Sequence, residues 1–211
     1  MTDPSVITWS FGNEIPEQRD ASSGATAQEL HGIILEEDPT RQSGAAMNNA
    51  GPGSTFADAL DTEGLNYQGE GRGESWDSAF PGFHAAYPDK VLWSTESASA
   101  VSTRGTYLFP VTSANSTNVG GADAGGDLEN LLVSAYELYA VSWGASPDKV
   151  FWQQDKYPYV AGEFVWTGWD YIGEPTPYDD DARSSYFGII DLAGFKKDRF
   201  YIYQARWRSD L

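Results

Sequence analysis

The 211-residue sequence contains no cysteine, so a disulfide framework, a thiolate nucleophile and a thiolate metal ligand are all excluded. Basic residues are scarce, because 13 lysines and arginines stand against 31 aspartates and glutamates, a formal net charge of -18. A potential of that sign repels phosphate backbones and anionic lipid headgroups, so we expect neither nucleic acid nor a membrane surface as a partner. No apolar run approaches the ~20 residues that cross a bilayer.

The first residues, MTDPSVITWSFG, lack the basic and apolar regions of a secretory signal. The compartment stays open on the sequence alone, and the missing signal and missing cysteines favour a cytoplasmic location. His31 and His84 match no metal-ligand pattern and are expected at the surface. We expect no metal site and no cofactor.

Aromatic residues are abundant, with 8 Trp, 12 Tyr and 10 Phe. Together with the aliphatic residues they suffice for a sizeable core. Exposed tryptophan and tyrosine rings also form stacking platforms for the apolar faces of sugars, and the acidic field does not repel a neutral sugar. Burial in the core is the alternative explanation for most of these rings, and solubility is the alternative for the acidic surplus.

Short apolar runs alternate with helical periodicity along the chain, which predicts a parallel α/β architecture. The expected strands, read as buried parallel strands where the apolar run is continuous, are Val6–Gly12, Ser43–Met47, Gly64–Tyr67, Val91–Ser94 and Glu163–Tyr171. The expected helices are Thr26–Glu37, Phe56–Leu60, Phe83–Tyr87, Leu128–Trp143 and Phe200–Trp207.

The helix expected over Leu128–Trp143 has the clearest apolar face of the five. The segment before it, Ser113–Gly126, is rich in Ser, Asn and Gly and is expected to form a surface loop, either a rim of the site or a mobile insertion. That loop contains the glycosylation sequon Asn115-Ser116-Thr117, which no secretion signal supports.

Two glutamates follow predicted strands. Glu14 comes after the first strand in TWSFGNE, and Glu96 comes after the Val91 strand in VLWSTESASA. In a parallel barrel these positions lie at the same edge of the sheet, where the catalytic groups of such folds are found. A retaining glycosidase needs two carboxyl groups roughly 5 to 5.5 Å apart, one protonated and one ionised. A glutamate after a strand is also common as a surface or ion-paired residue.

Four segments resemble glycoside hydrolase family 2, in the family's order and over nearly the whole chain. TWSFGNE resembles the strand of the acid/base, and STESASAVSTRGTYLFP resembles the nucleophile strand of the β-galactosidase branch. GEFVWTGWDYIGEPTPY and SSYFGIIDLAGFKKDRFYIYQ resemble the last strand, the loop that follows it and the last helix.

This resemblance implies that Glu14 is the general acid/base and Glu96 the nucleophile. It implies that Asn13 hydrogen-bonds the 2-hydroxyl of the sugar, and that Tyr67 hydrogen-bonds the nucleophile. For Tyr67 a packed core tyrosine remains the alternative.

The resemblance also matches Trp166 to an aromatic residue at the floor of the sugar subsite. Trp169, Asp170 and Glu174 match a loop at the mouth of the site, where they contact sugar hydroxyls or brace the loop.

The expected fold is an incomplete (β/α)8 TIM barrel, comprising strands four to eight with helix eight. Residues 1–211 would form a single catalytic-barrel portion, with the N-terminal β-sandwich domains and the first three barrel strands of the family absent. Three explanations of the missing strands compete: the chain is a piece of a longer polypeptide, it assembles with copies of itself or with another chain, or it is a natural truncation. We favour a truncated form that self-associates, as a homo-oligomer covering the open barrel edges.

The expected function is that of a retaining β-galactosidase, which hydrolyses terminal β-D-galactosides such as lactose through a covalent glycosyl-enzyme on Glu96. The alternatives are a β-glucuronidase or β-mannosidase of the same family, or a weakly active carbohydrate-binding truncated form.

Overall fold

The fold is taken from a computed structural model, which describes residues 3–72, 75–109 and 125–210. The predicted surface loop lies outside the described residues except for its last two positions, and so does the sequon at 115–117. The chain divides into two compact units. Unit 1 comprises Met1–Gly69, Ser78–Glu96 and Gln154–Glu163, and unit 2 comprises Glu70–Asp77, Ser97–Gln153 and Phe164–Leu211.

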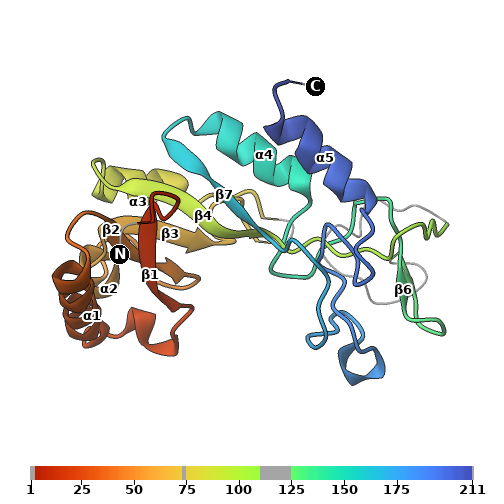
Figure 1. The fold of residues 1–211 in the computed structure, drawn as a ribbon, viewed down its shortest axis with the longest axis horizontal. Coiled ribbons are helices and arrows are strands. Elements are labelled where there is room, and N and C mark those ends of the chain that lie inside the picture. Colours follow the sequence, from red (N-terminus) through yellow and green to blue (C-terminus); the bar gives the residue numbers. More distant parts are fainter. Residues whose placement is uncertain (1–2, 73–74, 110–124, 211) are drawn as a thin grey trace. The chain divides into compact units, whose positions relative to one another are not determined.

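The five expected strands form one sheet, in the order β1-β2-β3-β4-β7 (Figure 1). Neighbouring strands from β1 to β4 are parallel. The strands are β1 (Thr8–Asn13), β2 (Gln42–Met47), β3 (Thr62–Asn66), β4 (Val91–Ala98) and β7 (Val160–Trp166). The expected α/β architecture with a mostly parallel sheet is therefore confirmed.

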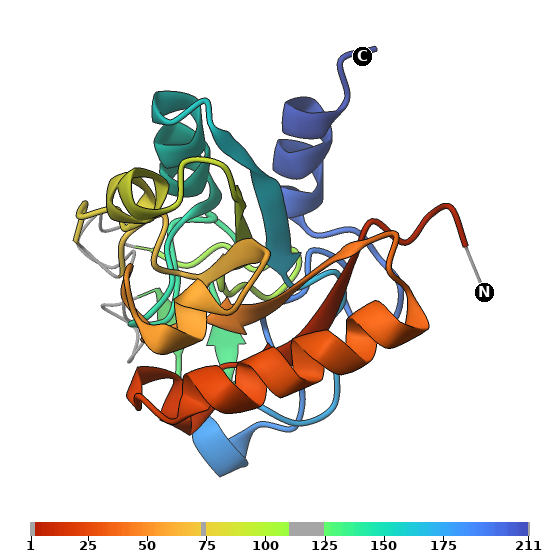
Figure 2. The ribbon, with the colours of Figure 1, turned by 90° about the vertical axis from the view of Figure 1, so that its left-hand side faces the viewer.

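Three helices connect the strands of unit 1: α1 (Ser23–Glu37), α2 (Thr55–Asp58) and α3 (Phe80–Ala86). Figure 2 shows α1 lying along β1 and β2, and the two strands do pack against it. Buried apolar side chains from these helices and from the inner strands form one core, in which Met47, Leu65 and Phe80 are fully buried. This core fixes the strands whose ends carry the candidate site.

Close approach of the inner strands depends on a glycine. A Cβ atom on Gly64 in β3 would lie 2.6 Å from Cγ2 of Thr95 and 2.9 Å from the carbonyl oxygen of Ala45. The Thr95 side chain thus occupies the space beside Gly64, and a side chain at position 64 would collide with it.

The expectation that the first strand is buried is wrong. In β1 the residues are exposed or half-buried, with Trp9 37% exposed, and Ile7 just before it is 67% exposed. The reason is its position at the edge of the sheet, where only β2 pairs with it. The Trp9 indole donates to a carboxylate oxygen of Asp38 at 3.1 Å, which anchors the ring.

The helix expected over Leu128–Trp143 is also wrong. Its residues form turns and the short strand β6 (Leu132–Val133), which pairs antiparallel with β5 (Gly126–Asp127). Leu131 and Glu137 have φ values of 55° and 56°, in the left-handed region that interrupts a helix.

Tertiary contacts satisfy the backbone of that segment instead. The Val133 amide donates to the Thr103 hydroxyl at 3.0 Å, and the Ala135 amide donates to the Thr106 carbonyl at 2.6 Å. The apolar residues of the segment, among them Val133 and Tyr139, supply much of the core of unit 2. The local periodicity therefore predicted correctly which residues are buried, but it predicted the wrong secondary structure for them.

Helix α4 (Pro147–Lys156) was not expected, whereas α5 (Asp198–Trp207) confirms the predicted closing helix. The start of α4, Ser146-Pro147-Asp148, follows the usual pattern of a proline and an acidic residue in the first helical turn. The strand predicted over Glu163–Tyr171 ends at Trp166, and the rest is loop.

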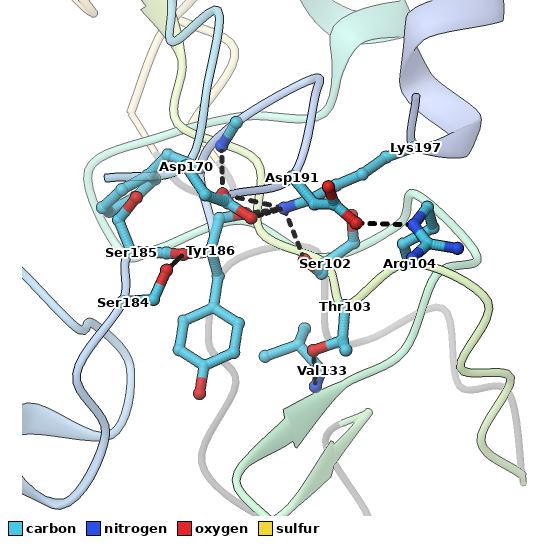
Figure 3. A network of polar contacts seen from close by, with 12 residues as sticks. Ser102, Thr103, Arg104, Val133, Asp170, Ser184, Ser185, Tyr186, Asp191 and Lys197 are labelled. Carbon is cyan, nitrogen blue, oxygen red and sulfur yellow. Dashed lines mark hydrogen bonds and ion pairs between the residues drawn. The ribbon is translucent and has the colours of Figure 1, made fainter. Parts of the chain in front are cut away.

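Buried charged side chains hold the loops of unit 2 together. The Lys197 ammonium, 1% exposed, donates to the carbonyls of Ser102 (2.8 Å) and Tyr186 (3.1 Å) and pairs with Asp170 at 2.7 Å (Figure 3). Burial, together with the neighbouring Arg199 charge, lowers the pKa of Lys197 to about 8, against the attraction of Asp170. Burial also raises the pKa of Asp170, against the attraction of Lys197.

Arg199, two residues after Lys197, has the same function. It is 1% exposed, lies 2.8 Å from a carboxylate oxygen of Glu137, donates to the Ser102 hydroxyl at 2.6 Å and also contacts the Ala100 carbonyl. These cations satisfy carbonyl groups that no strand ladder reaches.

Among the described helices, we find none with the length and apolar character needed to cross a bilayer.

Candidate active site

The candidate site lies in unit 1, where parallel strands β1, β3 and β4 end. Asn13 is the last residue of β1 and Glu14 follows it, Asn66 is the last residue of β3, and Glu96 lies in β4. The ends of parallel strands share one edge of the sheet, so residues distant in sequence meet there. The structure brings these residues together as follows.

Glu14 leaves the strand direction with a φ of 48°, in the left-handed region that costs a non-glycine residue about 1 kcal/mol or more. Its amide still donates to the carbonyl of Ala46 on β2, at 2.9 Å. Its side chain is half-buried, and its Oε1 accepts a hydrogen bond from Nδ2 of Asn66 at 2.9 Å. The carboxyl group thus reaches from β1 to β3, two strands away.

The intervening strand carries a small residue at this level. Ala46 of β2 is in register with Asn13, and a larger side chain there would compete with Glu14 for the space above the sheet edge. Asn13 itself is exposed, and its Oδ1 accepts a second hydrogen bond from Asn66 at 3.0 Å.

Glu96 approaches β3 from the other side. It is in register with Asn66, and its carbonyl accepts from the amide of Tyr67 at 2.9 Å. Its Oε2 accepts a hydrogen bond from the Tyr67 hydroxyl at 2.8 Å. Tyr67 is 5% exposed and has a φ of 61°, so the aromatic side chain is fixed by both burial and backbone. Two carboxyl groups therefore converge on the end of β3.

Sequence reasoning missed two residues of this arrangement. Asn66 is fully buried and binds the side chains of Asn13 and Glu14, while its Oδ1 accepts from the Thr95 hydroxyl at 2.7 Å. Both residues adjoin positions that the motifs had singled out, since Asn66 precedes Tyr67 and Thr95 precedes Glu96. Adjacency to those motif residues was the one signal for them in the sequence, and it does not show that they contact each other.

Trp166 and Trp169 belong to unit 2. Trp166 is half-buried, packs against the core of that unit and contacts Tyr171 edge-on, with ring centroids 5.9 Å apart. Trp169 is 63% exposed. Asp170, next to it, is held by Lys197 and by the Gly188 amide at 2.8 Å, so within unit 2 it braces the loop.

A hollow lies in unit 2, around the Lys197–Asp170 pair. It encloses about 330 Å³, and Arg104, which lies 2.6 Å from Asp191, forms part of its wall (Figure 3). Two cations and two carboxylates pair within it, so its charges are internally balanced.

Comparison with known proteins adds to this geometry. Over 241 residues the sequence is 35% identical to a β-galactosidase from Bacteroides ovatus, covering 97% of this chain and 27% of that protein. A stretch of 52 residues is 44% identical to a candidate β-glucuronidase from Formosa agariphila, covering 24% of this chain and 5% of that protein. The fold resembles that of a β-glycosidase from Bacteroides vulgatus, with a TM-score of 0.67 and 26% identity, covering 98% of this chain and 26% of that one. No protein-family profile matches the chain.

A parallel sheet whose strand ends gather two carboxyl groups, together with relatives of this kind, places the chain among the families of glycoside hydrolases. Within that class the chain belongs to glycoside hydrolase family 2. It spans about a quarter of the length of the Bacteroides ovatus relative and of the Bacteroides vulgatus structure.

Proposed function

We propose that this chain provides the catalytic groups of a retaining β-galactosidase that releases terminal β-D-galactose. The observation that carries the proposal is the convergence of Glu14 and Glu96 on the end of β3, each held by a hydrogen bond from a buried side chain. In the same proposal the five strands correspond to strands four to eight of a barrel, residues 1–211 form one catalytic-barrel portion, and self-association covers the open edges.

In the first step, Glu14 donates its proton to the glycosidic oxygen while a carboxylate oxygen of Glu96 attacks the anomeric carbon. The bond to the leaving oxygen breaks, the aglycone departs as an alcohol, and an ester joins the sugar to Glu96. In the second step, Glu14 takes a proton from water, whose oxygen attacks the anomeric carbon and releases the Glu96 carboxylate. Two inversions give net retention.

The neighbouring groups have separate roles in this scheme. The Tyr67 hydroxyl stabilises Glu96 as a leaving carboxylate in the second step. Asn13 donates to the sugar 2-hydroxyl, an interaction that strengthens in the transition state. The resemblance to the family assigns Trp166 to the floor of the sugar subsite and Trp169 to its mouth.

The second candidate is a β-glucuronidase, which the Formosa agariphila relative favours. A glucuronide carries a carboxylate that a cation would need to bind. In the described part of unit 1, the arginines contact Asn49 and Asp38, Lys90 contacts Glu63, and Lys156 lies over Tyr157. This distribution supports a neutral galactoside, and relative rates on nitrophenyl galactoside and glucuronide distinguish the two functions.

A mechanism-based label tests the assignment directly. Incubation with a 2-deoxy-2-fluoro galactoside bearing a good leaving group should esterify Glu96, because the fluorine slows both steps while the good leaving group keeps the first step fast enough for the ester to accumulate. Peptide mapping by mass spectrometry locates the label, and Glu96→Gln serves as the control that should stay unlabelled. A label on another carboxylate, or galactose binding without turnover that Glu96→Gln leaves unchanged, would refute the mechanism. The latter result would favour a carbohydrate-binding form.

A further inference from the structure

Asn66 is the residue through which the two carboxylate-bearing strands contact each other. It is fully buried, and its amide makes three hydrogen bonds, each to a polar side chain: Asn13 and Glu14 at the end of β1, and Thr95 within β4. Two run from Nδ2 to Asn13 and Glu14 beside β1, and the third is accepted by Oδ1 from Thr95 on β4. A buried asparagine with a purely structural role could be satisfied by backbone groups, whereas every one of these partners lies at the site.

The orientation of the Asn66 amide follows from the chemistry of its partners. A carboxylate group accepts hydrogen bonds, so the amide nitrogen must face Glu14. The Thr95 hydroxyl donates to the opposite side of the amide, where the oxygen lies. The hydroxyl and the Glu14 carboxyl group therefore select the same orientation of the amide, and without the hydroxyl only the acceptors beside β1 would hold it.

The same amide fixes the orientation of Asn13. Because Oδ1 of Asn13 accepts from Asn66, the NH2 group of Asn13 points away from it, and no described side chain accepts from that group. Asn13 is exposed, so its two donor hydrogens face the space in front of the sheet edge. This is the orientation needed to donate to a sugar hydroxyl.

We propose that Asn66, oriented by the Thr95 hydroxyl, is a positioning residue that holds the Glu14 carboxyl group and presents the Asn13 amide donors to the sugar. The proposal rests on the proposed function of Glu14 and Asn13. It extends that function by assigning a polar chain, Thr95 to Asn66 to Glu14, that couples the nucleophile's strand to the acid/base.

Leaving-group dependence separates positioning from simple structural damage. An alkyl galactoside needs proton donation to its leaving oxygen, whereas a dinitrophenyl galactoside does not. In Thr95→Val, which is isosteric but lacks the hydroxyl, kcat/KM for the alkyl substrate should fall roughly 10- to 100-fold. For the dinitrophenyl substrate the expected fall is several-fold smaller, since acid catalysis contributes little there and only the contact of Asn13 with the sugar is weakened. Thr95→Ser keeps the hydroxyl and should stay within about 2-fold of wild type on both.

Equal losses on both substrates in Thr95→Val would overturn the proposal, as would an equally large selective loss in Thr95→Ser. Circular dichroism and thermal melting of each variant identify a failure to fold.

A measurement that does not depend on activity is needed if a variant fails to fold, or if the wild-type chain turns over no galactoside. NMR spectroscopy provides it. The side-chain amide signals of Asn66 in ¹⁵N NMR should change in Glu14→Gln relative to the unmodified protein, because the amide donates to the Glu14 carboxyl group. Signals that stay unchanged in Glu14→Gln would refute the positioning role. Absent turnover with signals that change in Glu14→Gln would refute the proposed function alone.

Discussion

The two units use buried polar side chains in different ways. In unit 1, parallel pairing joins the backbones of neighbouring strands from β1 to β4, and the buried Asn66 and Tyr67 direct their polar atoms to Glu14 and Glu96. In unit 2, where loops predominate, the buried Lys197 directs its donors to backbone carbonyls.

The same pattern recurs elsewhere in unit 2. Lys149 donates to the carbonyl of Ser75 at 2.5 Å, and Gln153 donates to that of Trp76 at 3.1 Å. A loop without a ladder must satisfy its carbonyls in some way, and here long cationic and amide side chains do so. A polar substitution should therefore reduce activity in unit 1 and reduce stability in unit 2, and the following predictions test that difference.

The largest effect on the free energy of unfolding is expected for Arg199→Met. This change leaves the Glu137 carboxylate buried without its cation and removes donors from the Ser102 hydroxyl and the Ala100 carbonyl. Breaking one side of such a pair costs about 3–5 kcal/mol, measurable by urea unfolding. Arg199→Met combined with Glu137→Met should recover part of the loss. A loss below about 1 kcal/mol would mean that the loops hold without the buried pair.

Glu63 is the position where unit 1 resembles unit 2, because it is buried and paired with Lys90 at 2.9 Å. Burial raises the pKa of Glu63 from 4.5 to about 7, against the opposing hydrogen bond from Lys90. A folded-state pKa above the unfolded value stabilises the protein fully below pH 4.5, and that contribution is lost as pH rises through about 7.

Glu63→Gln should remove this pH dependence. Relative to wild type, the variant should gain stability between pH 4.5 and pH 8, by on the order of 2–3 kcal/mol in urea unfolding at each pH. Asp210, exposed and paired with Arg208 on the surface, offers a control, since Asp210→Asn should leave the curve unchanged. A constant difference between variant and wild type would contradict the prediction.

The smallest effect on stability is expected for Tyr67→Phe. The change removes one hydrogen bond to Glu96 and leaves the ring in place, so the free energy of unfolding should fall by only about 1 kcal/mol. Turnover should fall much more, roughly 10- to 100-fold, with the second step of the mechanism most affected. Accumulation of the labelled ester in rapid-quench experiments measures this. The pattern would be reversed if Tyr67 were an ordinary core tyrosine, with a large loss of stability and unchanged turnover.

The sequence predicted the elements of unit 1 better than those of unit 2, for a physical reason. A strand such as the one that begins at Val91 is recognisable locally, because a short apolar run with a turn at each end is enough to predict it. The carboxylates after such strands could then be placed at one sheet edge from the chain alone. Asn66 and Thr95 could not be recognised in the same way, because their partnership depends on the register between β3 and β4.

In unit 2 the local pattern was misleading. The apolar spacing of Leu128–Trp143 suits a helix, yet the hydrogen bonds from Val133 and Ala135 to the 103–106 segment determine its structure. Such tertiary bonds leave no trace in the local periodicity. The start of α4 was readable from Pro147-Asp148, since that pattern is local.

Gly64 restricts how this site can be redesigned. Because its missing side chain is the space that Thr95 fills, positions 64 and 95 are sterically linked across two strands, and enlarging one requires shrinking the other. An alanine at position 64 would meet Cγ2 of Thr95 first, so a serine at position 95 would relieve the closest of its contacts and still supply a hydroxyl. Libraries that vary one of these positions at a time would miss combinations that only pairs of changes can reach.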